Sequence, residues 1–260
     1  DDRARLQNFH NSILGKPWQP QIATINEATI DKLIEASPSY QKGELLEKPK
    51  ALLMGVDVQQ QIFYYMVTAV YESGRMSIVD YGRTISFEDL SILAQQQYRV
   101  KGGDETFGIY GAFIDAGYRT SDVYRFCRNS GMWFVPVFGR TKEQKMFVPI
   151  RRNDILFDNQ YITIVHINDT IFSTNVLLNG LRSGGDESIW FPSNSCKMLK
   201  EQLTAVTIQE KKDAKGFIQR ELVSKTENHW FDCLKLNLAM HYMIRPDLET
   251  EEVTPMPTVQ

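Results

Sequence analysis

Three aspartates stand at positions where the surrounding sequence favours apolar residues. Asp57 lies inside an apolar run, Asp115 closes a second one, and Asp232 follows two aromatic residues. An ionised carboxylate in an apolar strand is costly to desolvate unless a positive group neutralises it, and a hard divalent cation is the usual solution. We therefore expect the three carboxylates to form one Mg2+ site.

Carboxylates that hold two divalent ions can support phosphodiester hydrolysis. Ions about 3.5–4 Å apart activate a water on one side and stabilise the leaving oxygen on the other. Asp57 is the strongest candidate, because valines flank it on both sides and an acid there has little local reason to exist. A turn would explain Asp115, and the helix dipole would explain Asp232, without any chemistry. Together the three favour a metal-dependent nuclease.

Two further residues are candidates for the same site. His229 precedes Asp232 by three positions, which places both side chains on one face of a helix. Its imidazole could bind metal or orient an attacking water, and a solvated histidine in a first helical turn is the alternative. Asp80 ends another strand pattern and is a candidate outer ligand, although a turn cap explains it equally.

Contacts with DNA would have to come from local basic groups. The net charge of the 260-residue chain is −3, so no overall positive field attracts nucleic acid. Contacts with phosphates position a duplex without reading its bases. The candidates, each of which could also be a solvated loop charge, are Arg119, Lys142, Lys145, Lys211, Lys212 and Lys215.

Composition narrows the class of protein. Hydrophobic residues make up 42% and charged residues 23% of the chain, as in ordinary soluble globular proteins. The three cysteines are widely spaced, which argues against a disulfide framework or a structural zinc and favours a reducing cytoplasm. The sequence has no signal peptide, no apolar run of about 20 residues and no phosphate-binding loop. We expect a piece of a larger protein, without a nucleotide motor of its own.

A scaffold must bring positions 57, 115 and 232 together. Hydrophobic periodicity predicts strands over 51–58, 62–71 and 75–81, a helix over 87–98, a strand over 109–115 and a helix over 120–129 capped by Thr120 or Ser121. It then predicts strands over 133–138 and 161–167, a hairpin or loop over 140–159, helices over 169–182 and 193–203, a hairpin over 203–223 and a last helix over 228–244 stopped by Pro246. This order predicts an α/β fold with a mixed central sheet, in which an antiparallel three-stranded meander and parallel strands are flanked by helices.

The same pattern divides the chain into three parts. Residues 1–50 are polar and broken, and we expect them to form an N-terminal arm that packs on the domain. Residues 51–245 form the α/β domain. Residues 246–260 are acidic and rich in proline, and we expect a disordered tail.

The order of elements resembles that of the RNase H-like nucleases, with acids on the first and fourth strands and on a late helix. Within that family the chain is similar to the C-terminal nuclease domain of terminase large subunits from lambda-like tailed phages. The segments that carry the resemblance are GVDVQ at 55–59, VDYG at 79–82, IDAGYRT at 114–120, VYRFC at 123–127 and NHWFD at 228–232. They cover most of residues 50–245.

The resemblance implies an endonuclease that cuts concatemeric double-stranded viral DNA in the host cytoplasm, with two Mg2+ or Mn2+ ions. Asp57, Asp115 and Asp232 match the aspartate triad of the family by motif. His229 matches a variant that has a histidine three residues before the last aspartate. The implied partners are the terminase ATPase domain, the small terminase subunit and the portal. The resemblance also implies that the arm of residues 1–50 is a linker from an absent ATPase domain.

Two other interpretations stay open. Transposases, integrases and junction resolvases also use RNase H-like acid triads, although the sequence has no separate DNA-reading motif such as a helix-turn-helix. A non-catalytic docking module of the packaging motor, in which the acids are structural, is the second. Metal-dependent cutting of DNA would separate the nuclease from the docking module.

Overall fold

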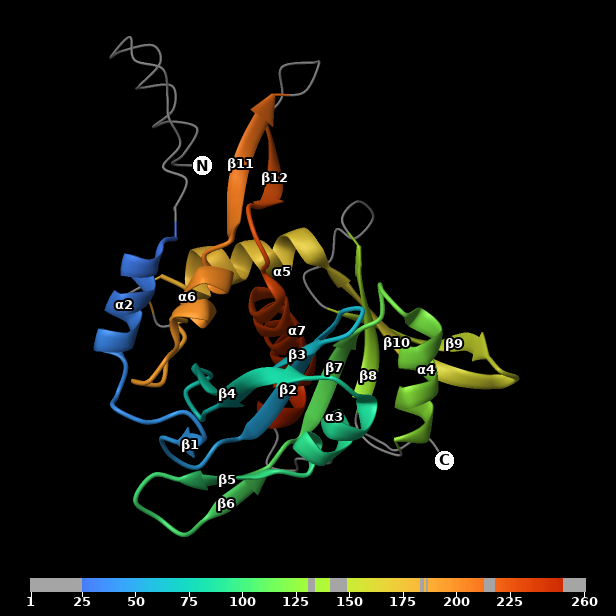
Figure 1. The fold of residues 1–260 in the computed structure, drawn as a ribbon, viewed down its shortest axis with the longest axis horizontal. Coiled ribbons are helices and arrows are strands. Elements are labelled where there is room, and N and C mark those ends of the chain that lie inside the picture. The colour runs from blue at the N-terminus through green and yellow to red at the C-terminus, as the bar shows by residue number, and fades with distance from the viewer. Residues whose placement is uncertain are drawn as a thin grey trace.

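A seven-stranded mixed sheet is the centre of the molecule (Figure 1). The computed structural model describes residues 25–130, 134–140, 149–182, 185, 187–212 and 218–249, with residues 210–212, 218–221 and 246–249 described by their backbone alone. The strands follow the order β4-β3-β2-β7-β8-β10-β9 across the sheet. Their bounds are β2 Ala51–Val58, β3 Phe63–Val70, β4 Met76–Thr84, β7 Gly111–Asp115, β8 Phe134–Arg140, β9 Ile150–Phe157 and β10 Gln160–Asn168.

Strand direction divides the sheet into a meander and a parallel part. Strand β3 pairs antiparallel with both β2 and β4, which gives the predicted three-stranded meander. Strands β2, β7, β8 and β10 pair parallel to one another, and β9 closes the edge antiparallel to β10. The carboxyl ends of the four parallel strands therefore share one edge of the sheet. This confirms the predicted α/β fold with a mixed central sheet.

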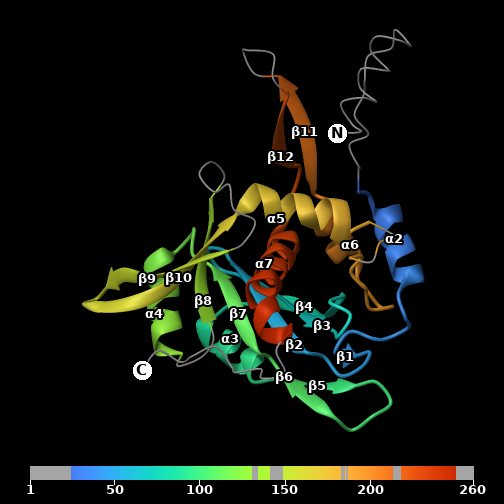
Figure 2. The ribbon, with the colours of Figure 1, turned by 180° about the vertical axis from the view of Figure 1, so that it is seen from behind.

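Both faces of the sheet are covered, and the two views from opposite sides show different helices in front (Figures 1 and 2). Alternate residues of β2 belong to two separate hydrophobic cores, so the strand is apolar throughout because each face is buried. One core contains residues of α2 (Glu27–Ala36), α5 (Asp169–Asn175), a π-helix η2 (Val176–Gly180), α6 (Lys197–Leu203) and α7 (His229–Glu249). The other contains residues of α3 (Phe87–Ala94), α4 (Thr120–Asn129) and a small sheet of β1 (Glu44–Leu45), β5 (Gln97–Val100) and β6 (Thr106–Gly108).

Helix α7 lies unusually close to β2 at Gly55. A methyl group added to Gly55 would stand 2.1 Å from the carbonyl oxygen of Cys233, far inside any allowed contact, so only glycine fits there. Polar contacts hold the helix in the same place. The Cys233 thiol donates to the Tyr64 carbonyl at 3.4 Å, and the Asn237 amide donates to the Met66 carbonyl at 3.0 Å.

Several predicted boundaries were wrong. The helix predicted over 87–98 ends at Ala94, since residues 97–100 pair with β1 and β6 in a small sheet. The helix predicted over 169–182 is α5 followed by the π-helix. The last helix continues through Pro246 to Glu249, although a proline inside a helix removes one backbone hydrogen bond and crowds the preceding turn.

The hairpin predicted over 203–223 is present as β11 (Val206–Lys212) and β12 (Ile218–Ser224), which project away from the main sheet (Figure 1). Residues 25–50 pack against the domain, with Ile30 and Leu33 of α2 buried in its core. The role of residues 1–50 as an arm from another domain stays a prediction, and residues 1–24 and 250–260 lie outside the described part. Among the described helices, none is long and apolar enough to cross a membrane.

Candidate active site

Two of the predicted aspartates lie side by side at the carboxyl edge of the parallel strands. Strands β2 and β7 are in register at Val56 and Ile114, so Asp57 and Asp115, one residue further along each strand, are neighbours. Asp57 shares a strand face with Gly55, where α7 crosses, because side chains two apart in a strand point the same way. Both aspartates therefore face the helix that carries Asp232.

Asp57 is 2% exposed and hydrogen-bonded on one oxygen. Its Oδ2 accepts from Gln59 Nε2 at 2.9 Å and lies 2.6 Å from Nδ1 of His229. The His229 ring stacks on Tyr64, with 4.2 Å between ring centroids. The hydrogen bond to Asp57 raises the pKa of His229, although partial burial opposes it. The structure thus joins His229 to the site as a direct partner of Asp57.

Asp115 is fixed by the turn that follows β7. Its Oδ1 accepts the backbone N–H of Gly117 at 2.9 Å. Burial raises the pKa of Asp115, the Gly117 hydrogen bond lowers it, and the negative charges of Asp57 and Asp232 raise it further. These carboxylates are therefore close enough to repel one another.

Asp232 occupies the first turn of α7. Its backbone N–H bonds to the Asn228 carbonyl at 3.0 Å, and its Oδ2 accepts from the Asn228 side-chain amide at 2.9 Å. Burial raises the pKa of Asp232, and the charges of Asp57 and Asp169 add to this effect, whereas Lys235 opposes it. The site thus carries an excess of negative charge, which a cation would relieve.

Two further residues of the site were not predicted. The ammonium of Lys235, 9% exposed, donates to Asp232 Oδ1 and to Asp169 Oδ1, both at 2.6 Å. Burial alone would lower the pKa of Lys235, but the two carboxylates outweigh burial and raise it. Asp169 begins α5 directly after β10, at the same edge of the sheet as Asp57 and Asp115. The sequence offered one signal for each residue. Asp169 is a charged residue directly after a parallel strand, and Lys235 lies one helical turn after Asp232.

A cavity of about 260 Å³ opens among these groups. Its wall combines three carboxylates and one ammonium with small and apolar residues: Asp115, Gly117, Phe138, Gly139, Ile167, Asp169, Asp232, Lys235 and Leu236.

The donors suit a hard divalent cation in kind, because they are carboxylate oxygens with an uncompensated negative field. Among the described residues, however, no three acidic, histidine or cysteine side chains converge closely enough to hold a metal ion. The Asp232 carboxylate is hydrogen-bonded to Lys235, and the Asp57 carboxylate is hydrogen-bonded to His229 and Gln59. Metal binding at Asp57, Asp115 and Asp232 therefore stays a prediction, and it requires some of these side chains to rearrange.

Asp80 lies outside this group. It sits on β4, two strands away from β2, where it accepts from the Tyr98 hydroxyl at 3.1 Å and pairs with Lys42 at 3.3 Å. Tyr98 belongs to the core on the opposite side of the sheet from α7. The structure thus separates this buried carboxylate from the other acids.

Arg119 adopts the left-handed backbone conformation, with φ 52°, at the N-cap of α4. It holds this cap position in place of the predicted Thr120 or Ser121, and no side chain caps the helix. Its guanidinium bonds to Asp122 at 3.0 Å and to the Gln60 carbonyl at 3.4 Å. Arg119 therefore ties the turn after β2 to α4, and a phosphate contact would have to share these partners.

The other predicted phosphate contacts are not described in enough detail to place. Lys211 and Lys212 end β11, where the structure describes the backbone alone. The remaining three lie outside the described residues: Lys142, Lys145 and Lys215.

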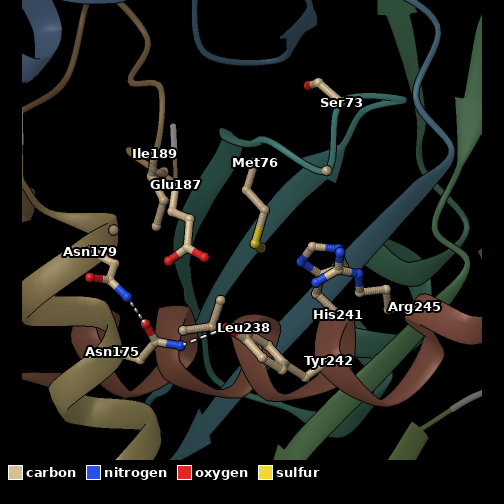
Figure 3. Close-up of a pocket in the computed structure, with 12 residues that line it drawn as sticks. Ser73, Met76, Asn175, Asn179, Glu187, Ile189, Leu238, His241, Tyr242 and Arg245 are labelled. Atoms are coloured by element: carbon tan, nitrogen blue, oxygen red, sulfur yellow. Dashed lines mark hydrogen bonds between the residues drawn. The ribbon is translucent and has the colours of Figure 1, made fainter. Parts of the chain in front are cut away.

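A second cavity, of about 160 Å³, lies further along α7 (Figure 3). His241, Tyr242 and Arg245 of the helix line it together with Asn175 and Glu187. The Asn175 amide donates to the Tyr242 hydroxyl at 3.0 Å. None of the predicted site residues lines this cavity.

Comparison with protein families gives a match over almost the whole chain. A family model described as the endonuclease domain of the terminase large subunit gpA matches residues 1–252. Among curated proteins, none matches the chain at a significant level.

Solved structures of phage terminases are similar at low sequence identity. The large terminase nuclease from thermophilic phage G20c is 11% identical over 84% of this chain and 97% of its own, with a TM-score of 0.44. The magnesium-bound structure of the same nuclease is 12% identical over 85% of this chain and 98% of its own, with a TM-score of 0.49. The large terminase of bacteriophage HK97 is 11% identical over 92% of this chain and 49% of its own, with a TM-score of 0.37.

Proposed function

The chain belongs to the family of terminase large subunit gpA endonuclease domains, and on that premise we propose that it cuts concatemeric double-stranded viral DNA by metal-dependent hydrolysis. The observation that carries the proposal is the proximity of Asp57, Asp115 and Asp232 at one end of the sheet, where burial and then the neighbouring negative charges raise the pKa values of Asp115 and Asp232. Buried carboxylates are unstable unless positive charge compensates them, and the single ammonium of Lys235 does not compensate all of them.

We assign the three aspartates as the residues that would hold Mg2+ or Mn2+. Two such ions, when bound, supply an activated water and charge stabilisation for the leaving oxygen. The chain supplies partners that support two of these ligands: His229 and Gln59 contact Asp57, and the Gly117 N–H donates to Asp115. Ligands locked in this way by outer hydrogen bonds are typical of functional metal sites.

His229 has a positioning role in this proposal. Its Nδ1 faces Asp57 while its ring lies flat on Tyr64, so the imidazole can turn little without breaking one of the two contacts. A raised pKa favours the imidazolium, whose Nδ1–H would donate to the Asp57 carboxylate.

DNA would be held near the site by other parts of the packaging machine as well as by this domain. The chain carries a net charge of −3, and affinity for a duplex comes mainly from neutralised phosphates. We therefore propose weak intrinsic binding through Arg119 and the five candidate lysines, with the ATPase domain, small subunit and portal as partners in the host cytoplasm.

The decisive experiment is nicking of supercoiled plasmid in EDTA, Mg2+ and Mn2+. We expect wild type to cut only with a metal ion, and Asp57→Ala to be inactive while remaining folded. Asp80→Asn is the matched control, because Asp80 is also a buried acid of the sheet but belongs to another cluster, and it should cut normally.

Three results would contradict the proposal. Full activity of Asp57→Ala would remove Asp57 from the chemistry. A folded wild type that stays inert with both ions would favour the non-catalytic docking module. Cutting restricted to branched or transposon-end DNA would favour the resolvase or transposase interpretation.

A further inference from the structure

Lys235 places a positive charge of the protein itself among the acids. Its ammonium bridges Asp169 and Asp232 at 2.6 Å to each, and only 9% of the residue is exposed. Burying a lysine costs free energy unless carboxylates compensate it, and here both carboxylates come from elements that line the same cavity.

This arrangement conflicts with metal binding at Asp232. One oxygen of Asp232 accepts from Lys235 and the other from Asn228. A carboxylate has further lone pairs, but an ammonium in contact repels a divalent ion at the same carboxylate. Lys235 must therefore withdraw from Asp232 before a metal ion can bind there.

Asp169 offers Lys235 a second partner. Because the ammonium already contacts Asp169, it can leave Asp232 without losing every negative neighbour. Asp169 also stands at the carboxyl end of β10, on a different element from Asp232, so movement of one carboxylate does not require movement of the other.

We propose that Lys235 is an internal cation that competes with the divalent metal for Asp232, and that Asp169 is the positioning residue that retains Lys235 when the metal takes Asp232. The inference deepens the proposed function and rests on it. It adds a residue pair that sets metal affinity without itself binding metal.

The test is calorimetric titration of the folded domain with MnCl2, without DNA. Lys235→Met removes the competitor and should bind Mn2+ about tenfold more tightly, the size of effect expected for one hydrogen bond to a charged group. Asp169→Asn leaves Lys235 with Asp232 as its remaining anionic partner and should bind Mn2+ correspondingly more weakly. Lys235→Gln, which keeps hydrogen bonds, serves if the Met variant fails to fold.

The double variant Lys235→Met/Asp169→Asn tests whether Asp169 affects Mn2+ affinity through Lys235 or through its own charge. If Asp169 acts through Lys235, the double variant binds Mn2+ like Lys235→Met alone, because the two effects are not additive. An affinity back at the wild-type value would mean that both residues act through space or that Asp169 binds the metal, and would overturn the proposal. Unchanged affinity in Lys235→Met and in Lys235→Gln would do the same.

Asp57→Asn identifies the site that is being titrated. Suppose that wild type binds Mn2+ and Asp57→Asn does not. A wild-type Mn2+ affinity in Lys235→Met would then contradict only the competition between Lys235 and the metal, and the nuclease proposal would stand. If neither wild type nor Lys235→Met binds Mn2+, both proposals fail. Binding by Lys235→Met but not by wild type would support the competition in its strongest form.

Discussion

The surroundings of the two ends of helix α7 shift the pKa values of their histidines in opposite directions. Near its start, His229 meets the carboxylate of Asp57, which raises the pKa of the imidazole. Near its end, burial lowers the pKa of His241 to about 4, and the positive charge of Arg245 adds to the effect. One helix therefore carries a histidine that favours the charged form and another that stays neutral.

The difference shows that the partner across the interface, and not the helix, decides the charge of each group. At the start of α7 the partners are acids that end strands β2 and β7 and begin α5. At its end the cavity is lined by amides, a phenol and an arginine besides the acid Glu187 (Figure 3). The cluster of acids thus lies at the first end, and the second is a polar pocket with one acid and one arginine beside the core.

The largest effect should come from breaking the contact that docks the first end. Gly55→Ala places a methyl group 2.1 Å from the Cys233 carbonyl, and the clash is with backbone that cannot rotate away. We expect the free energy of unfolding to fall by about 3 kcal/mol, the upper range for overpacking, together with loss of DNA cutting. Urea denaturation and plasmid nicking measure the two effects.

Gly103→Ala is the matched control for this substitution. The nearest atom to an added methyl group at Gly103 lies at an ordinary 3.8 Å, so stability and cutting should stay near the wild-type values. An equally stable Gly55→Ala would contradict the close docking of α7 on β2.

A smaller effect is expected from replacing His229, and it concerns the rate of DNA cutting. His229→Gln loses the ring that stacks on Tyr64 and the contact with Asp57, and loss of such a supporting partner lowers activity about 10- to 100-fold. Steady-state nicking rates in Mg2+ measure it. His241→Gln, at the other end of the helix, should cut at the wild-type rate, and equal losses in both variants would erase the distinction between the ends.

The smallest effect concerns stability at acid pH. Because the pKa of folded His241 is about 4 and that of an unfolded histidine is about 6.5, the unfolded chain takes up the proton first. The contribution of neutral His241 is therefore complete above pH 6.5 and is lost as the pH falls towards 4.

Wild type should lose on the order of 1–2 kcal/mol more stability than His241→Gln across this window. Urea midpoints at several pH values give the difference, in which the titration of other groups cancels. Parallel pH profiles for the two proteins would show that His241 does not stay neutral in the fold.

Sequence patterns predicted those residues of the candidate site that stand out as acids within an apolar run. Asp57 and Asp115 were predicted because a carboxylate inside a strand contradicts its surroundings, and His229 followed from its spacing to Asp232. Asp169 and Lys235 could not be predicted in this way, since an acid in a first helical turn and a lysine within a helix are ordinary surface residues. Their burial results from tertiary pairing alone.

The same limit applies to the fold. Six strands of the main sheet carry strong local patterns and were predicted within a few residues, whereas β9 lies in the segment 140–159 that was predicted as a hairpin or loop. The small sheet of β1, β5 and β6 was missed because its strands are two to four residues long and pair across distant parts of the chain. Pairing of this kind leaves little periodicity in the sequence.

The position of α7 within the chain affects when the site comes into existence. Asp57, Asp115 and Asp169 precede it along the sequence, and the helix that brings His229, Asp232 and Lys235 is the last element of the described chain. A partly folded chain in which α7 has not docked on β2 therefore holds an incomplete set of acids. Assembly of the candidate site is thus coupled to the docking of this one helix.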